Sequence, residues 1–456
     1  MKKLKTITSA RPGFYRQLFV LVLPIVLQNL ITSAVSMADV VMLGRTTQTY
    51  LSASSLAGQV QFLLNVVYFG LNSAITIMAS QYWGKGDAKT IAKIFGIGLY
   101  ICVPISAFAA VFALVSPRTL IGIWTNVPEL IDAGSVYLRF VALSYFFAGF
   151  SQPYLAVMKS CERVKLSTVI SFITLGLNVI LNAVLIFGLF GMPAMGIAGA
   201  ALATSISRGC ELAICAGDFL HQKIMPRSIA NMLRIPGILL KDFCRYSLPA
   251  FINDMMWGLA FNMNSIIMGH LGSDIVAANS VVTVARELVT TVGFGISSAS
   301  SIMLGKEIGE NLTETARSDA SSVMRTAFIA SLLQGIILLA VTPIVPEFAK
   351  VSSTAKYYMK VMLIISCVYQ IGQIMNTVMI ASLFRCGGDS RYGMILDICT
   401  MWLWAVPAGL ISAFVLNLPP LIVYAVMCTD EFVKMPFALH HYKHADWIRN
   451  LTRDIE

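Results

Sequence analysis

Apolar residues run along this chain in long stretches, separated by short segments that hold most of its charged residues. A helix needs roughly 20 predominantly apolar residues to cross the hydrocarbon layer of a membrane. Twelve such windows occur, six in each half of the chain. They are Leu18–Leu43, Leu56–Ala79, Ile91–Val115, Val136–Met158, Leu166–Phe190, Met195–Ala216, Leu248–Leu271, Ile275–Met303, Val323–Val345, Tyr358–Phe384, Met394–Leu416 and Leu421–Leu439. The pattern predicts an all-α membrane protein with twelve transmembrane helices.

The two halves repeat the same landmark residues at one constant spacing of 225 positions (249 − 24, 264 − 39 and 269 − 44). The matched pairs are Pro24 with Pro249, Asp39 with Asn264, and Gly44 with Gly269. Because each half holds six windows, an even number, both halves begin on the same side of the membrane and the repeats are parallel. Paired halves of this kind are typical of secondary transporters. We therefore expect two six-helix bundles around a central cleft.

Composition supports a membrane location. The chain is 57% hydrophobic and 12% charged, whereas soluble domains carry about 25% charged residues. Its net charge of +10 does not indicate nucleic-acid binding, because 25 of the 33 Lys and Arg fall on one side when even-numbered connections and both termini are assigned to the cytoplasm. That asymmetry is the positive-inside pattern. We predict a multi-pass protein of the plasma membrane with both termini cytoplasmic.

The repeat predicts an N-terminal six-helix lobe over residues 1–220, a cytoplasmic linker over 221–243, and a C-terminal six-helix lobe with a cytoplasmic tail over 244–456. The linker mixes basic and apolar residues, which is typical of a segment lying among lipid headgroups. The nine Cys are scattered without a C-x-x-C pair, which indicates neither a metal site nor a disulfide framework. No cluster of candidate catalytic residues stands out. We therefore expect a monomer without enzymatic activity or cofactor.

Three polar residues in apolar helices form the first candidate site. Asp39 lies in the first window, and Asn178 and Asn182 share one face of the fifth because they are four residues apart. Ionisable side chains at bilayer depth are costly and mark functional sites. Burial disfavours a charged carboxylate, which suits Asp39 to carry a proton or bind Na⁺, with oxygen ligands from the two amides. The alternatives are an interfacial Asp39 paired with Arg45, and Asn side chains that only join helices.

Further candidates lie in the substrate cleft or at a second ion site. Amides and aromatic rings on the fourth and tenth windows could line a site for flat organic cations, although such residues also pack helices together; they are Gln152, Tyr154, Tyr369, Gln370, Gln373 and Asn376. Asp254 and Asp397 lie in the cytoplasmic half of their windows. Asp397 would serve as a gate or ion site, or bond to the loop that holds Arg385 and Arg391.

Two charged pairs inside the windows are interpreted as structural. Arg208 and Glu211 have the spacing of neighbours on one helix face. Arg286 and Glu287 are adjacent, near the middle of the eighth window. We expect them to compensate each other's charge, together with partners on other helices.

Several segments taken together resemble the MATE (multidrug and toxic compound extrusion) transporters, and the resemblance covers the whole chain. They are Pro24, Asp39 and Gly44 in the first window, Ala79–Asp87, Asn178–Asn182, the Gly-Ile-Ala-Gly-Ala-Ala run at 196–201, and Phe384–Arg391 followed by Asp397, Met401 and Trp402. The segment Phe384–Arg391 is similar to the RAGGDT loop of a bacterial branch.

The resemblance implies a cation-coupled antiporter, driven by H⁺ or Na⁺, that exports organic cations and other amphipathic compounds. Asp39 matches the family's first-helix carboxylate. Asn182 stands where many prokaryotic relatives carry Asp, and Trp257 where another branch carries an acidic residue, so this chain departs from the family's pattern at both positions. The alternative is a flippase for lipid-linked saccharides, which would line its cleft with several cations. Few basic residues lie inside the windows, mainly Arg139, Arg208 and Arg286.

Overall fold

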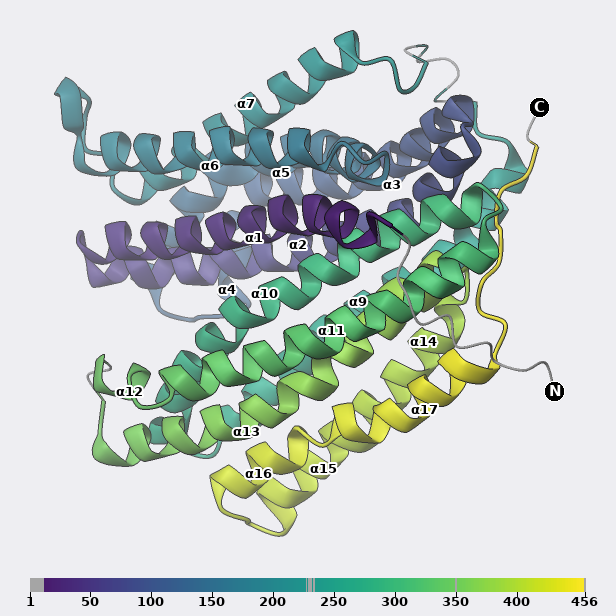
Figure 1. Ribbon diagram of the computed structural model, residues 1–456. Coiled ribbons are helices and arrows are strands. Elements are labelled where there is room, and N and C mark those ends of the chain that lie inside the picture. Colours follow the sequence, from purple (N-terminus) through teal and green to yellow (C-terminus); the bar gives the residue numbers. More distant parts are fainter. Residues whose placement is uncertain (1–11, 227, 229–231, 233, 349–350, 455–456) are drawn as a thin grey trace. The chain divides into compact units, whose positions relative to one another are not determined.

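The computed structural model describes residues 12–226, 228, 232, 234–348 and 351–454, and most of them are helical (Figure 1). The predicted cytoplasmic start of the chain and part of the predicted linker lie outside these ranges. The first half contains α1 (Phe14–Gly44), α2 (Gln48–Lys85), α3 (Ala88–Val115), α4 (Pro117–Gly122), α5 (Pro128–Ser160), α6 (Val164–Phe187), the 3₁₀ turn η1 (Leu189–Gly191) and α7 (Ile197–His221).

The second half follows the same order with more interruptions. It contains α9 (Gly237–Gly269), α10 (Ser273–Gly309), α11 (Thr313–Val341), α12 (Val345–Phe348), α13 (Ser353–Thr377), the π-helix η2 (Val378–Phe384), α14 (Ser390–Ile398), the π-helix η3 (Cys399–Ala405), α15 (Val406–Leu410), the π-helix η4 (Ile411–Val415), α16 (Pro420–Met427) and α17 (Asp430–His444).

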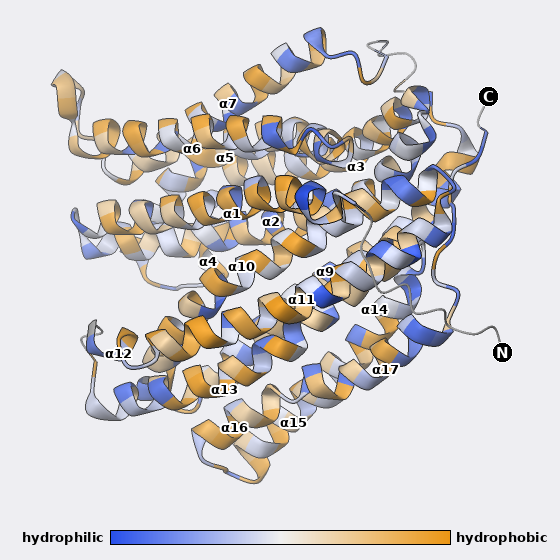
Figure 2. Ribbon diagram, viewed as in Figure 1, coloured by the Kyte–Doolittle hydropathy of each residue, from blue (hydrophilic) through white to orange (hydrophobic). Residues whose placement is uncertain are grey.

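All twelve predicted windows fall on helices, which confirms the all-α membrane fold. Within the described ranges, nine helices are long and apolar enough to cross a membrane. The other three predicted spans fall on α7, α9 and the α16–α17 segment. Figure 2 shows long hydrophobic stretches along α6 and α11, which fit a lipid environment.

Two spans differ from the prediction in detail. The twelfth window is not one helix, because the chain turns between α16 and α17 at Cys428 and Thr429. The eleventh is continuous but alternates α- and π-helical turns around Pro407. Proline lacks an N–H and breaks the usual hydrogen-bond ladder, and a local π-helical turn can accommodate that change inside a membrane protein.

Tertiary contacts divide the chain into two compact units. The N-terminal unit comprises Leu27–Ala79 and Gly86–Lys241, in which α3 packs on α5, α5 on α7 and α7 on α6. The C-terminal unit comprises Asp242–Asp454, the residues up to Val26 and the segment Ser80–Lys85. In it α11 packs on α13, α10 packs on both, and α13 packs on α17. The predicted lobes were drawn from the sequence repeat, whereas these units follow packing.

The repeat appears directly in a reciprocal contact inside the C-terminal unit. A Cβ atom on Gly84 would lie 2.0 Å from the carbonyl oxygen of Lys306, and one on Gly309 would lie 1.9 Å from that of Gln81. Gly84 and Gly309 are 225 positions apart, as are Gln81 and Lys306 (309 − 84, 306 − 81). The ends of α2 and α10 therefore cross at backbone contact through equivalent residues.

The turns that follow these two helices also match. Gly86 after α2 has a φ of 77°, and Asn311 after α10 has a φ of 63°. They are 225 positions apart (311 − 86). Both adopt the left-handed conformation that Gly and Asn tolerate best. Equivalent positions of the two halves thus share a backbone conformation as well as residue types.

The close crossing of α2 and α10 predicts a stability effect. Gly309→Ala places a methyl group where the Gln81 carbonyl now lies, and overpacking of this kind typically costs about 1–3 kcal/mol or more. Thermal unfolding of the purified protein in detergent should show a lower midpoint. Gly58→Ala in α2 is the matched control, because nothing lies within 4 Å of its added Cβ. Equal midpoints for the two variants would contradict the contact.

Candidate functional site

The three predicted residues of the first half lie together in the N-terminal unit. The Asn182 side-chain N–H group donates to Asp39 Oδ1 at 2.5 Å and to Asn178 Oδ1 at 3.1 Å. Asn178 in turn donates to Thr204 Oγ1 at 3.4 Å. The cluster joins α1, α6 and α7, because the four-residue spacing on α6 presents both amides to the same neighbours.

Burial distinguishes the members of this cluster. Asn182 is 1% exposed and Asn178 is 6% exposed, whereas Asp39 is half-buried. The buried Asn182 Oδ1 accepts no hydrogen bond from the described residues. Asp39 forms no ion pair with Arg45, so the interfacial pairing considered from the sequence is wrong. The carboxylate is bound by a neutral amide donor.

An apolar cluster lies one helical turn from the polar residues on each of the three helices. Leu43 follows Asp39 by four residues, Ile186 follows Asn182 by four, and Ala200 precedes Thr204 by four. Leu43, Ile186 and Ala200 pack together, and Tyr137 of α5 packs against them. This contact separates the polar cluster from the end of the unit at which α1 turns into α2.

Gln152 and Tyr154, the other first-half candidates, belong to two further polar networks on α5 and α7. Gln152 donates to Glu211 at 3.4 Å, and Glu211 also accepts from Ser151 at 2.6 Å. Arg208 pairs with Glu211 at 2.7 Å, which confirms the predicted structural pair. These residues neutralise one another within the unit and do not join the Asp39 cluster.

The Tyr154 hydroxyl donates to Asp218, which also forms two hydrogen bonds with Arg163 at 3.0 and 3.1 Å. The Tyr154 ring packs edge-on against Phe95 and Phe219. With its hydroxyl engaged and its ring enclosed by aromatic neighbours, Tyr154 acts as a packing residue. It does not present a free face to a flat ligand.

In the C-terminal unit, Asp254 of α9 pairs with Arg385 through two hydrogen bonds of 2.7 and 3.0 Å. The side chains are 7% and 5% exposed. A bidentate Arg–carboxylate pair is among the strongest charged contacts in a protein. Asp254 is therefore neutralised by Arg385, which the sequence analysis had considered as a partner of Asp397. Arg385 itself is helical, directly after η2.

Asp397 instead pairs with Lys434 of α17 at 2.7 Å and accepts from Asn253 at 2.9 Å. The proposed bond between Asp397 and the Arg385–Arg391 loop is wrong. Lys434 also lies 3.4 Å from Glu431. Lys434 is one of the 25 Lys and Arg that the sequence analysis assigned to the cytoplasmic side, and its side chain is 3% exposed. The three-residue spacing between Glu431 and Lys434 within the predicted twelfth span was the sequence signal for this pair.

Asn376, a predicted cleft residue, donates to the Glu431 backbone oxygen at 2.7 Å and to its carboxylate at 2.8 Å. It thereby ties α13 to α17. Gln370 donates to Thr290 at 2.9 Å and joins α13 to α10. Both amides connect helices, which is the alternative that the sequence left open for them.

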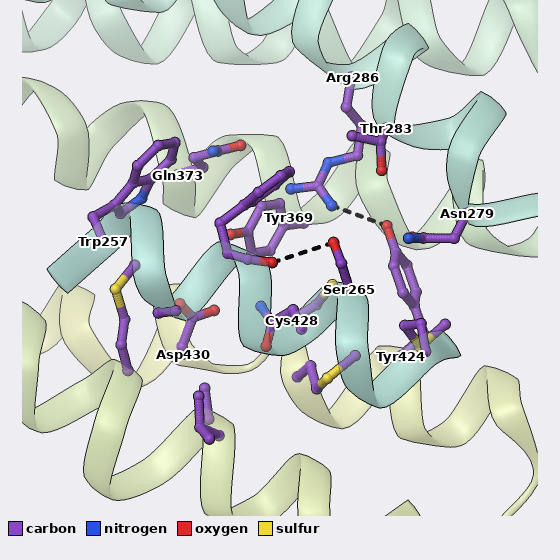
Figure 3. A pocket seen from close by; sticks show the side chains of 18 residues that line it. Trp257, Ser265, Asn279, Thr283, Arg286, Tyr369, Gln373, Tyr424, Cys428 and Asp430 are labelled. Carbon is purple, nitrogen blue, oxygen red and sulfur yellow. Dashed lines mark hydrogen bonds between the residues drawn. The ribbon is translucent and has the colours of Figure 1, made fainter. Parts of the chain in front are cut away.

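Gln373 and Arg286 line a cavity of about 70 Å³ in the C-terminal unit (Figure 3). Arg286 donates to the Tyr424 hydroxyl at 3.0 Å, and its guanidinium lies 4.5 Å from the centre of the Tyr369 ring. Glu287 points away and is exposed. The expected mutual compensation of Arg286 and Glu287 is wrong, because adjacent residues on a helix face different directions.

The duplicated twelve-helix architecture, with a polar cluster buried in one unit and a polar cavity in the other, defines a membrane transporter. The MatE family model matches residues 24–184 and 249–411, and the chain belongs to the MatE family. The two matches begin 225 positions apart (249 − 24), so the family element occurs once in each half. The RAGGDT-like loop as a mark of a bacterial branch stays a prediction.

Two relatives span nearly the whole chain. One is named probable multidrug resistance protein NorM, from Bradyrhizobium diazoefficiens; it is 24% identical over 86% of this chain and 85% of its own length. The other is named uncharacterized transporter YisQ, from Bacillus subtilis; it is 22% identical over 95% of each chain.

Two solved structures share the fold. The Vibrio cholerae MATE transporter VcmN in its bent form aligns with a TM-score of 0.84 and 16% identity, over 96% of this chain and 99% of its own. A transporter of the MOP superfamily from Pyrococcus furiosus aligns with a TM-score of 0.85 and 16% identity, over 98% and 100%. That structure is described as having a binding pocket of reversed polarity that suggests a different function.

The buried Asp254–Arg385 pair predicts strong coupling between its two members. Arg385→Ala removes the guanidinium that neutralises the buried Asp254 carboxylate, and breaking a buried ion pair in this way typically costs about 3–5 kcal/mol of stability. Replacing both residues, as Asp254→Leu with Arg385→Met, removes both charges and should cost clearly less. Unfolding of the single and double variants in detergent gives the coupling energy. A double variant that loses the sum of the two single losses would show that the pair is not coupled.

Proposed function

We propose that this protein is a secondary active antiporter of the plasma membrane that exports small amphipathic organic compounds in exchange for H⁺ or Na⁺. The observation that carries the proposal is the hydrogen-bonded cluster of Asp39, Asn182 and Asn178 inside apolar helices. Membership of the MatE family and relatives named for multidrug resistance support an export function.

The cluster suits a single monovalent ion. Asp39 supplies one formal negative charge, and the Asn178 and Asn182 amides supply neutral oxygens. One proton or one Na⁺ would neutralise the carboxylate, whereas a second cation would leave uncompensated charge in a low dielectric. We therefore infer that H⁺ and Na⁺ compete for Asp39, with one coupling ion per cycle in this half.

The repeat supports assigning the coupling ion to the first half. Asn264, the counterpart of Asp39, is neutral and lines the cavity of the C-terminal unit. Equivalent positions of the two halves thus carry a titratable group in one case and a fixed amide in the other. In this proposal the first half takes the ion, and the second half contributes polar and aromatic contacts to the exported compound.

Organic cations are the substrates that family resemblance suggests, and the cavity of the C-terminal unit modifies this expectation. The Tyr369 ring, one of the aromatic faces proposed for a flat cation, already carries the Arg286 guanidinium at 4.5 Å. A cation approaching the same ring would meet like charge. Substrates with purely cationic character are therefore expected to bind elsewhere in the protein.

The role of Asp39 predicts that Asp39→Asn keeps the protein in the membrane and abolishes ion-driven export. The amide keeps the shape of the side chain but can neither carry a charge nor release a proton. Protein reconstituted in vesicles, with the Na⁺ and pH gradients imposed separately against a fluorescent organic reporter, measures this. Asp132→Asn, an exposed carboxylate on α5, is the control and should transport normally. Normal export by the Asp39→Asn protein would remove the basis of the proposal.

A second carboxylate placed in the cluster should alter its response to pH. Asn182→Asp sets two carboxyl groups at hydrogen-bond distance, and two close negative charges are costly, so one carboxyl holds its proton to higher pH. The pH profile of transport should shift upward. Asn178→Ser is the comparison variant, since it changes an amide without adding charge. An unchanged profile for Asn182→Asp, alongside inactive Asp39→Asn, would exclude Asn182 from the ion site.

A further inference from the structure

The cavity of the C-terminal unit combines a cationic side chain, a carboxyl group and aromatic walls. Figure 3 shows Arg286 beside Tyr424 on one side of this cavity, and Asp430 on the other side with Trp257. Its volume of about 70 Å³ has room for several waters or for the polar end of an organic molecule. The Asp39 cluster belongs to the other unit, so this cavity is a separate feature.

Arg286 is the first anchor of the cavity. Among the described residues it forms no ion pair, and its polar partner is the neutral Tyr424 hydroxyl. A charged side chain at bilayer depth is energetically unfavourable, and such residues are generally paired or functional. A guanidinium has five N–H donors. Donors therefore remain for an anionic group that enters the cavity between Tyr369 and Tyr424.

Asp430 is the second anchor. Its side chain is 5% exposed, and its Oδ1 atom accepts no hydrogen bond from the described residues. Lys434, one turn further along α17, is already paired with Asp397 and Glu431. Asp430 forms no ion pair within the described part of the chain. It therefore offers a carboxyl oxygen to a donor that enters the cavity.

Two amide oxygens of the cavity lining are further acceptors. Gln373 Oε1 and Asn264 Oδ1 are buried, and neither accepts a hydrogen bond from the described residues. A buried acceptor without a partner is unfavourable, so a ligand that donates to it is favoured. The cavity thus has one strong donor group and three acceptors.

The remaining lining consists largely of aromatic rings and flexible methionine side chains. The Trp257 and Phe261 rings stack at 5.9 Å with an interplanar angle of 20°. Met268, Met401 and Met427 complete the lining. Methionine side chains adapt to ligands of different shape and make favourable contacts with rings. An aromatic body is therefore the apolar partner that these walls fit.

We propose that this cavity binds zwitterionic aromatic compounds, with the carboxylate of the ligand on Arg286 and its ammonium group directed to Asp430, Gln373 and Asn264. The inference rests on the proposed export function, for which it names a substrate class. Arg286 and Asp430 carry opposite charges. A zwitterion therefore matches both, whereas a pure cation is repelled by Arg286 and a pure anion leaves Asp430 without a partner.

The test is direct binding, which does not depend on transport. Three probes with one aromatic body are titrated calorimetrically into the purified full-length protein at neutral pH: naphthylalanine (zwitterion), its amide (cation) and its N-acetyl derivative (anion). Each relative lacks one charge-assisted hydrogen bond, so the zwitterion should bind at least about tenfold more tightly than either relative. If the amide binds as tightly as the zwitterion, or if none of the probes binds, the proposal is wrong.

Variants then assign the two anchors. Arg286→Gln should weaken naphthylalanine and its N-acetyl derivative about tenfold and should strengthen binding of the amide, because the like charge is removed, while Arg286→Lys should stay within about threefold of the unaltered protein. Asp430→Asn should abolish the preference for the free amine. Glu287→Gln, the exposed neighbour of Arg286, is the matched control. Unchanged affinities in Arg286→Gln would overturn the assignment. Because the Asp39→Asn protein should bind the probes normally, loss of export and loss of binding remain distinguishable.

Discussion

A charged side chain inside a membrane must be neutralised, and this constraint organises the polar interior of the chain. Hydrocarbon offers no water, so each ionised group needs a counter-charge, a set of hydrogen bonds or a ligand. The protein meets the requirement with a few concentrated contacts. Asp254 is held by Arg385, Asp397 by Lys434, and Glu211 by Arg208. Against this background of complete pairs, the carboxyl groups and cations that lack a charged partner stand out.

Ionisable side chains without a charged partner have different surroundings in the two units. In the N-terminal unit a single carboxylate is bound by amides alone, an arrangement in which a small cation can complete the charge balance. In the C-terminal unit an arginine and an aspartate face one cavity without meeting each other. One arrangement suits an ion and the other a larger molecule of mixed charge. The duplication supplied the same framework twice, and substitutions such as Asn264 for Asp39 separated the tasks.

Much of the fold was predictable because apolar windows and a constant offset are one-dimensional signals. The convergence of Asp39, Asn178 and Asn182 was also predictable, since helix spacing puts the two amides on one face and both helices belong to one repeat. Which residues pair as ions was not predictable from the sequence. Asp254, Asp397, Arg385 and Lys434 lie on different helices, and which carboxylate meets which cation depends on helix rotation. The sequence contains no measure of that rotation. The prediction that the adjacent residues Arg286 and Glu287 compensate each other's charge was wrong for the same reason.

The reciprocal glycine contact between α2 and α10 has a consequence for how the chain can change. Gly84 and Gly309 each accommodate the backbone of the other repeat, so a side chain acquired at either position disturbs the opposite half. The two copies of the ancestral segment are therefore not free to diverge at these positions. Elsewhere they have diverged, as at Asp39 and Asn264, which lie 225 positions apart. Splitting the chain into two six-helix polypeptides would turn this crossing into a subunit interface.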